Sequence, residues 1–171
     1  SAGTPLFSGL CRRASTRPFR IRAATRKAHM IMNQTTMNHP SPLFASFLVA
    51  AGGGTGAVLR YQLGRAITGL FPASSGGFPW PTLAVNVLGS LAMGALIGWL
   101  ARHGGGGSEA WRLLLGVGLL GGFTTFSSFS LELVMLWERG AALAALNYAL
   151  VSVIAGVAGL FIGLSIMRVA A

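Results

Sequence analysis

Charged side chains are scarce in this sequence of 171 residues. Only 9% of the residues are Asp, Glu, Lys or Arg, and the acidic residues number just three. A soluble domain usually carries about 25% charged residues. A chain this poor in charge has little with which to face water. A very hydrophobic soluble helical bundle is the alternative to a membrane protein, and it is disfavoured because no helical stretch has a continuous polar face.

Cysteine is nearly absent as well, and histidine is rare. Cys11 is the only cysteine, so no internal disulfide can form and the redox compartment cannot be inferred. The histidines are His29, His39 and His103, and they share no spacing typical of metal ligands. A zinc site is therefore not expected.

Long stretches lack any charged residue, and they occupy residues 43–59, 78–101, 113–131 and 141–167. A helix needs roughly 20 apolar residues to cross the hydrocarbon core of a bilayer, and about 17 can suffice. The sequence therefore predicts an all-α integral membrane protein. Its four transmembrane helices are expected at about residues 43–63, 80–101, 111–137 and 141–167.

The net charge of +10 is concentrated in an N-terminal tail rather than spread as a nucleic-acid-binding surface would be. Seven of the 13 basic residues precede residue 28, where no acid occurs: Arg12, Arg13, Arg17, Arg20, Arg22, Arg26 and Lys27. Such a tail resembles an organelle transit peptide. Alternatively, it is upstream sequence translated from a start assigned too early, with true starts at Met30, Met32 or Met37. In either case we expect residues 1–40 to lie outside the fold and residues 41–171 to form the four-span unit.

The arginines of the four-span unit divide evenly between the two sides of the membrane. Alternating spans assign Arg102, Arg112 and Arg168 to one side, and they assign Arg60, Arg65 and Arg139 to the other. The orientation of a membrane protein follows the asymmetry of Lys and Arg near its span ends. Without asymmetry, we expect insertion in both orientations and antiparallel pairing, unless the basic tail fixes the orientation.

Polar side chains within the predicted spans are few and nearly all neutral. They are Thr82, Asn86, Ser90, Thr124, Thr125, Ser127, Ser128, Ser130, Asn147, Tyr148 and Ser152. Polar groups at membrane depth mark either helix packing or a transport pathway. Hydroxyl and amide donors suit an anion, whereas no acid lies at the centre of any span. For each single Ser or Thr, the alternative is packing or a bond to its own i−4 carbonyl.

The third span contains the run GGFTTFSSFS, which is poor helix material at Gly121, Gly122 and Thr124. A break there would free backbone carbonyls that a cation could satisfy. A helix that continues with a kink is the equal alternative. Past this point Phe126 and Phe129 share one helix face. Their electropositive ring edges could line the path of a small anion, or the rings could simply pack or face lipid.

Three motifs, GGGTGAVLRY, TLAVNVLGS and GGFTTFSSFS, resemble in order and spacing the Fluc (CrcB-like) family of fluoride channels. The resemblance covers residues from about 45 to 168. It implies a passive fluoride-selective channel, not an enzyme, that exports F⁻ across the bacterial inner membrane and so lowers cytoplasmic fluoride toxicity. It also implies an antiparallel, dual-topology homodimer of four-span subunits with two pores.

The same resemblance implies roles for particular residues. Phe126 and Phe129 correspond to pore phenylalanines, Asn86 to a pore-lining asparagine, and Arg60 to an arginine near the aqueous vestibule. The backbone carbonyls of Gly121 and Thr124 correspond to ligands of a structural Na⁺ at the dimer centre. Weaker candidates for a polar pore lining are Thr82, Ser127, Ser128, Glu132, Tyr148 and Ser152.

Two other classes of membrane protein are weighed against a channel. A small four-helix multidrug or cation exporter would need a carboxylate in its first span, and residues 43–59 contain none. A non-transporting assembly subunit would explain the GxxxG pairs Gly52/Gly56 and Gly159/Gly163, which suit close helix packing. It would not explain the polar third span. The expected partners are therefore a second copy of the chain, fluoride and lipid, and not nucleic acid.

Overall fold

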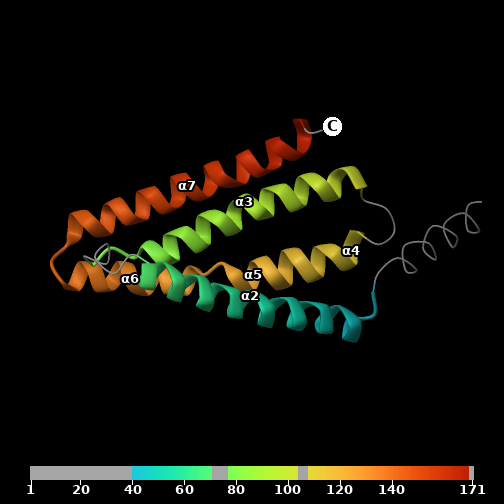
Figure 1. Ribbon diagram of the computed structural model, residues 1–171, viewed down its shortest axis with the longest axis horizontal. Coiled ribbons are helices and arrows are strands. Elements are labelled where there is room, and N and C mark those ends of the chain that lie inside the picture. Colours follow the sequence, from blue (N-terminus) through green and yellow to red (C-terminus); the bar gives the residue numbers. More distant parts are fainter. Residues whose placement is uncertain (1–39, 71–76, 104–107, 170–171) are drawn as a thin grey trace, which may run out of the picture. The chain divides into compact units, whose positions relative to one another are not determined.

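A computed structural model describes residues 40–70, 77–103 and 108–169, and every regular element in these ranges is a helix. Four segments are long and apolar enough to cross a membrane: α2 (Pro42–Leu70), α3 (Trp80–His103), the third segment Ser108–Glu138 and α7 (Ala142–Val169). Figure 1 shows them alternating in direction. The prediction of four spans is therefore confirmed. The predicted N-terminal tail falls, except for its last residue, outside the described ranges.

The third segment is not one uniform helix. It consists of α4 (Ser108–Trp111), the π-helix η2 (Arg112–Leu120), α5 (Gly121–Phe123) and α6 (Phe126–Glu138). Between α5 and α6 the backbone is extended, with ψ of 157° at Thr124 and 118° at Thr125. The π-helix was not anticipated from the sequence. At its end the Gly121 N–H donates to the carbonyls of Gly116 and Gly118.

Helix α2 runs seven residues past its predicted end at residue 63, to Leu70. The reason is that no proline interrupts the chain between Pro42 and Pro72. Proline blocks the helical hydrogen bond and disfavours helix in the residue before it. As a result, Arg65 lies within α2 rather than after it, as Arg60 already did in the predicted span.

Helices α3 and α7 lie side by side, as Figure 1 shows, and their backbones approach closely through glycine. A Cβ atom on Gly94 would overlap the carbonyl of Leu160, and one on Gly163 would overlap the carbonyl of Leu91. Only glycine allows this approach, which is the usual basis of small-residue packing in membranes. The close packing predicted for Gly163 is confirmed.

Helix α2 packs against η2 in the same way. A Cβ atom on Gly52 would overlap the carbonyl of Leu114, and one on Gly56 would overlap the carbonyl of Leu119. The GxxxG pair of the first span therefore fixes α2 against the third segment, directly before the extended residues.

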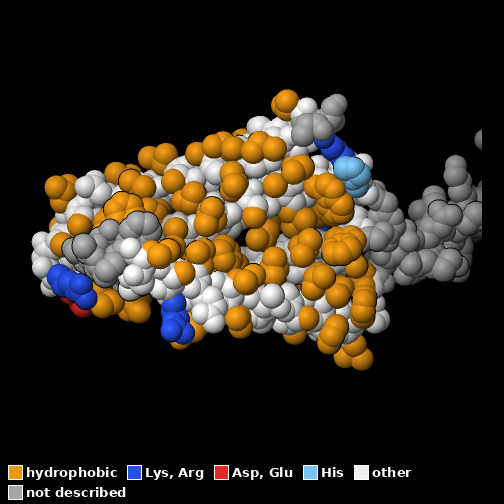
Figure 2. All heavy atoms as spheres, in the orientation of Figure 1, with side chains coloured by type: hydrophobic (Ala, Val, Ile, Leu, Met, Phe, Trp, Pro, Cys, Tyr) orange, Lys and Arg blue, Asp and Glu red, His pale blue; other side chains and the backbone are white. Residues whose placement is uncertain are grey.

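The outward faces of the helices are covered with large apolar side chains (Figure 2). Within the described ranges the buried apolar core residues are Leu83, Val85, Leu120, Leu136, Ala145 and Tyr148. Soluble proteins rarely expose apolar patches of more than a few hundred Å². Surroundings of lipid or of another apolar protein surface remove that cost.

The arginines gather toward the two ends of the helices. Arg65 and Arg139 lie toward the end formed by the C-termini of α2 and α6, at the left of Figure 1. Arg102, Arg112 and Arg168 lie at the opposite end, where α3 and α7 finish and the third segment begins. For these five arginines the positions agree with the division assigned from the sequence, whereas Arg60 lies farther from the helix end, beside Thr124. Insertion in both orientations stays a prediction.

Candidate functional site

The extended residues of the third segment are stabilised by a compact set of hydroxyl contacts. Thr125 is the N-cap of α6, and its Oγ1 accepts a hydrogen bond of 3.2 Å from the Ser128 amide. Its hydroxyl also lies 3.3 Å from Ser127 Oγ and 3.2 Å from Ser128 Oγ. A threonine that caps the first turn satisfies an amide that the helix itself cannot. Thr125 therefore starts a new helix, which is why α6 begins at Phe126.

Asn86 of α3 replaces the helical hydrogen bonds that Thr125 lacks. Its Nδ2 donates to the Thr125 carbonyl at 3.1 Å, and its Oδ1 accepts from the Thr125 amide at 2.8 Å. A side-chain amide has a donor and an acceptor side by side, so it can pair with both polar groups of one residue. Because the Thr125 amide donates to Asn86, it does not donate back to Gly121 as it would in a continuous helix.

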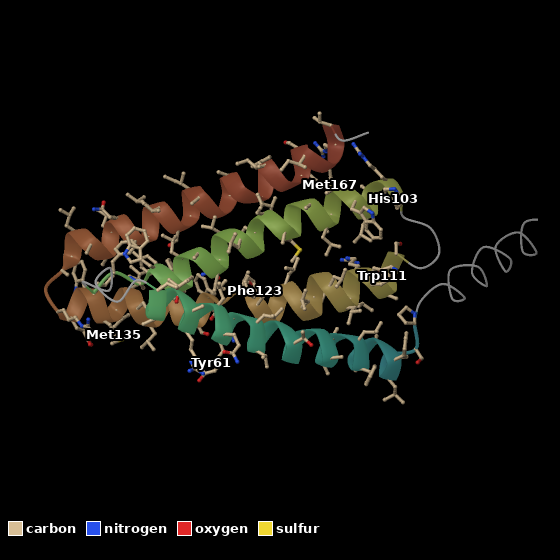
Figure 3. All side chains as sticks on the ribbon, in the orientation of Figure 1. Tyr61, His103, Trp111, Phe123, Met135 and Met167 are labelled. Carbon is tan, nitrogen blue, oxygen red and sulfur yellow. The ribbon has the colours of Figure 1, made fainter. Side chains whose placement is uncertain are left out.

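Two neighbouring contacts hold Thr124. Its Oγ1 donates to the Leu120 carbonyl at 2.9 Å. Its methyl group and the ring of Phe123, which is labelled in Figure 3, both lie against Gly89 of α3. A side chain at position 89 would displace them. Gly89 therefore lets α3 approach the extended residues closely enough for Asn86 to reach Thr125.

An open groove of about 270 Å³ runs between α3, α6 and α7 beside these residues. Its lining includes four of the predicted pore residues, which are Asn86, Phe126, Phe129 and Ser152. The structure therefore brings side chains from three predicted spans to one place. No charged residue lines the groove.

The two phenylalanines form a pair along the groove. Their ring centroids are 5.7 Å apart with an interplanar angle of 39°. Phe126 is 79% exposed, which is unusual for a residue at the start of a packed helix. Phe129 is half-buried and its ring lies 5.1 Å from that of Tyr148. One ring is thus anchored in the protein interior and the other is available to a neighbour.

Ser152 of α7 carries a buried hydroxyl with no hydrogen-bond partner among the described residues. Leaving such a group unsatisfied costs about 1–3 kcal/mol. Ser152 is one of the residues that line the groove.

Glu132 belongs to a separate buried cluster rather than to the groove. Thr82 Oγ1 donates to Glu132 Oε1 at 2.6 Å, and the Tyr148 hydroxyl donates to Glu132 Oε2 at 2.7 Å. Tyr148 is completely buried, with 0% of its surface exposed. The cluster joins α3, α6 and α7, and the contact between Tyr148 and Phe129 places it next to the inner end of the groove.

The remaining predicted lining residues have a local role. Ser127 and Ser128 lie in the first turn of α6 and contact Thr125, and neither lines the groove. The groove also has lining residues beyond the predicted pore residues, notably Ser90, which the sequence marked only as a polar residue within a span, and Gly156, which it did not mark. Gly156 continues the four-residue spacing of Tyr148 and Ser152 along α7. That periodicity is the signal by which it could have been found.

Three positions predicted from the sequence remain: Arg60 and the backbone carbonyls of Gly121 and Thr124. Arg60 Nη1 lies 3.5 Å from the Thr124 carbonyl oxygen. The Gly121 carbonyl is released from its helical bond, because the Thr125 amide donates to Asn86. Neutral backbone oxygens are ligands that hard cations accept. The Thr124 oxygen already attracts one positive group, so these two carbonyls fit a hard cation such as Na⁺ as donors.

These features define a small multi-pass membrane protein with a groove of neutral polar groups and a buried polar cluster beside it. The sequence pattern of the family described as CrcB-like protein, Camphor Resistance (CrcB), matches residues 47–164. The chain therefore belongs to the CrcB-like family, and it is a multi-pass bacterial membrane protein.

Three similar proteins each carry the name fluoride-specific ion channel FluC. The one from Novosphingobium aromaticivorans is 60% identical over 124 residues, which cover 72% of this chain and 96% of the relative. That from Erythrobacter litoralis is 51% identical over 128 residues, covering 74% and 94% respectively. That from Phenylobacterium zucineum is 54% identical over 125 residues, covering 72% and 95%.

Proposed function

We propose that this chain is the subunit of a passive, fluoride-selective ion channel that lets F⁻ leave the cell and so reduces its toxicity. The observation that carries the proposal is the groove of neutral donors beside the extended residues of the third segment. Relatives at 60% and 51% identity that are named fluoride-specific ion channels support the same function.

The groove has the chemistry to replace the water around a small anion. The Ser152 hydroxyl has no acceptor among the described residues, so its proton is free to turn toward an anion. Asn86 uses one amide proton on Thr125 and keeps the other. The edges of Phe126 and Phe129 carry partial positive charge. Together they favour an anion without a fixed positive charge that would hold it too tightly.

A second copy of the chain completes the path. The groove is open on one side, and Phe126 projects from it with 79% of its surface exposed. A partner face laid over the groove would enclose it and bury that ring. The even division of arginines supports an antiparallel, dual-topology homodimer, because neither orientation is favoured by charge.

We assign the carbonyls of Gly121 and Thr124 to a structural Na⁺ at the centre of this dimer. A bound Na⁺ would supply positive charge to oxygens that the interruption between α5 and α6 leaves without helical partners. The residues of this chain prepare the site. Asn86 holds the Thr125 amide away from Gly121, and the extended Thr124 turns its carbonyl out of the helix.

The buried cluster extends the polar lining past the second phenylalanine. Thr82, Glu132 and Tyr148 lie directly behind Phe129, with the Tyr148 ring in contact with it. We assign Arg60 to the approach to the path, where its positive charge attracts anions from solution.

The two other classes of membrane protein lack such support. An exporter coupled to protons would need a carboxylate in the first span, and residues 43–59 contain none. A non-transporting assembly subunit would not require a groove lined by a hydroxyl without a described partner and by an exposed phenylalanine ring.

Reconstitution in liposomes tests the function. Vesicles that contain only this protein should release F⁻ down its gradient, should release Cl⁻ far more slowly, and should need neither a proton nor a Na⁺ gradient. Flux that required a counter-gradient would favour an exporter, and no flux at all would favour an assembly subunit.

A further inference from the structure

A second open hollow is lined mainly by residues of α2 and is larger than the groove. It has a volume of about 580 Å³, and its lining includes Arg60, Tyr61, Arg65 and Thr68 of α2 and Pro81 of α3. We call it the arginine cavity. Pockets of about 300–1,000 Å³ suit ligands of the size of small organic molecules. The arginine cavity is thus far larger than a bare halide requires.

The arginine cavity holds two positive charges that no acid in the lining offsets. The whole sequence has three acidic residues, Glu109, Glu132 and Glu138. Glu109 pairs with Arg112 at 3.3 Å, and Glu132 accepts from Thr82 and Tyr148. Across residues 40–70, 77–103 and 108–169, neither Arg60 nor Arg65 has an acid within ion-pair distance.

The arginine side chain at position 65 is held in place without an acid. Its guanidinium carbon lies 5.8 Å from the centre of the Tyr61 ring, within the range of a cation–π contact. Figure 3 shows Tyr61 on the outer side of α2. A guanidinium stacked on a ring keeps its N–H groups directed outward in a planar fork, which matches the oxygens of a phosphate.

The level of the arginine cavity along the membrane normal favours a lipid headgroup as its ligand. Pro81 lines it, and the adjacent Trp80 begins α3 with 48% of its surface exposed. Tryptophan gathers at the level of the lipid headgroups. Basic pockets between transmembrane helices at that level bind anionic headgroups.

From these observations we infer that the arginine cavity binds the phosphate of an anionic phospholipid, with Arg65 as its cationic partner. This site lies apart from the groove and shares only Arg60 with the proposed approach to the ion path, and it rests on the placement of the chain in a membrane. The lipid occupies the space between α2 and α3 and offsets the charge that no acid offsets.

Native mass spectrometry of the full chain tests the site. The protein is released from nanodiscs containing equal amounts of phosphatidylglycerol and phosphatidylcholine, and the retained lipids are counted. The unaltered protein should retain phosphatidylglycerol preferentially. Arg65→Gln should lower that retention about fivefold, as expected for one arginine near the membrane surface. Arg168→Gln, at an exposed arginine at the opposite end of the helices, is the matched control and should retain the lipid as the unaltered protein does.

Three outcomes would overturn the inference. Equal retention by Arg65→Gln and the unaltered protein would remove Arg65 from any lipid site. An equal loss in Arg168→Gln would mean general attraction of anionic lipid to positive charge. Inorganic phosphate that displaces phosphatidylglycerol at millimolar concentration would assign the cavity to a free anion instead.

Fluoride flux, measured on the same samples, separates this site from the proposed channel. Unchanged flux in Arg65→Gln together with lost lipid would support a lipid site apart from the ion path. Lost flux with unchanged lipid would reject the lipid site and place Arg65 on the ion path. If Arg65→Gln does not fold, Tyr61→Leu removes the supporting ring and should lower lipid retention in the same direction.

Discussion

Asn86 and Thr125 exchange two hydrogen bonds, of 3.1 Å and 2.8 Å, across 39 residues of sequence. One side-chain amide thus takes the place of a turn of helix at the point where the third segment is extended. The same asparagine lines the groove. A single residue therefore both maintains the interruption and faces the proposed ion path.

Replacing Asn86 by Asp should reduce F⁻ flux more than about tenfold, because a negative charge in a poorly screened setting repels an anion. The aspartate also loses the donor to the Thr125 carbonyl. Flux from liposomes, measured with a fluoride electrode, is the readout. Asn147→Asp, at an exposed position near the start of α7, is the control and should conduct normally. Undiminished flux in Asn86→Asp would remove Asn86 from the path.

The phenylalanine pair can be tested by changing ring to aliphatic side chain. Phe126→Ile and Phe129→Ile should each reduce F⁻ flux about tenfold, equivalent to ~1.4 kcal/mol, because Ile keeps apolar bulk but has no electropositive edge. Phe161→Ile is the control, since Phe161 is an exposed phenylalanine of α7 outside the groove. Normal conduction in both groove variants would show that the rings serve only packing.

The substitution Ser152→Ala should lower conduction without lowering stability. The change removes a buried hydroxyl that has no partner in the described part of the chain, so stability should stay equal or rise by up to ~1 kcal/mol. F⁻ flux should fall all the same, because a donor to the anion is lost. Thermal unfolding in detergent and liposome flux give the two readouts, with Ser165→Ala of α7 as the exposed control. A variant that is less stable and conducts normally would contradict the proposed role.

Alanine substitutions should affect stability differently at a glycine in the contact between α3 and α7 and at a glycine outside it. Gly163→Ala should destabilise the protein by about 1–3 kcal/mol, because the new methyl group would overlap the Leu91 carbonyl. Gly54→Ala of α2 meets no atom within 4 Å, so it should be neutral or stabilising by up to ~1 kcal/mol. Thermal unfolding of both variants checks the contrast. Equal effects would mean that α3 and α7 are farther apart than described.

Orientation can be tested through the basic tail. A version of the chain that begins at Met37 has three arginines on each side and should insert both ways. The version beginning at Ser1 adds seven positive charges to one side, and these should hold the N-terminus in the cytoplasm. A compartment-sensitive reporter on the C-terminus reads out both. A single orientation for the Met37 version would defeat the dual-topology proposal.

The spans and the position of the extended residues could be predicted from the sequence. Stretches such as residues 141–167 carry no charge, and hydrophobic length alone decides that they cross a bilayer. Gly121 and Gly122 followed by threonines indicated where the third helix would be weakest. Composition did not settle whether it breaks there or merely kinks, because that depends on a hydrogen-bonding partner from α3.

The separation of the polar residues into two sites could not be predicted. Glu132 and Ser152 lie on different faces of the packed helices, and only the rotation of α6 against α7 decides which of them meets the groove. The π-helix η2 also left no local signal, since it arises where α2 packs closely against Leu114 and Leu119. Such features depend on contacts between distant segments.

The π-helix η2 gives the third span a tolerance to changes in length that a uniform α-helix would lack. Each hydrogen bond of a π-helix encloses one residue more than that of an α-helix. The loss of one residue between Arg112 and Leu120 can therefore be absorbed by converting a π-turn into an α-turn, while Thr124 keeps its register against α3. Insertions and deletions normally accumulate in loops. In this protein, a membrane-spanning helix can also accommodate such a change in length.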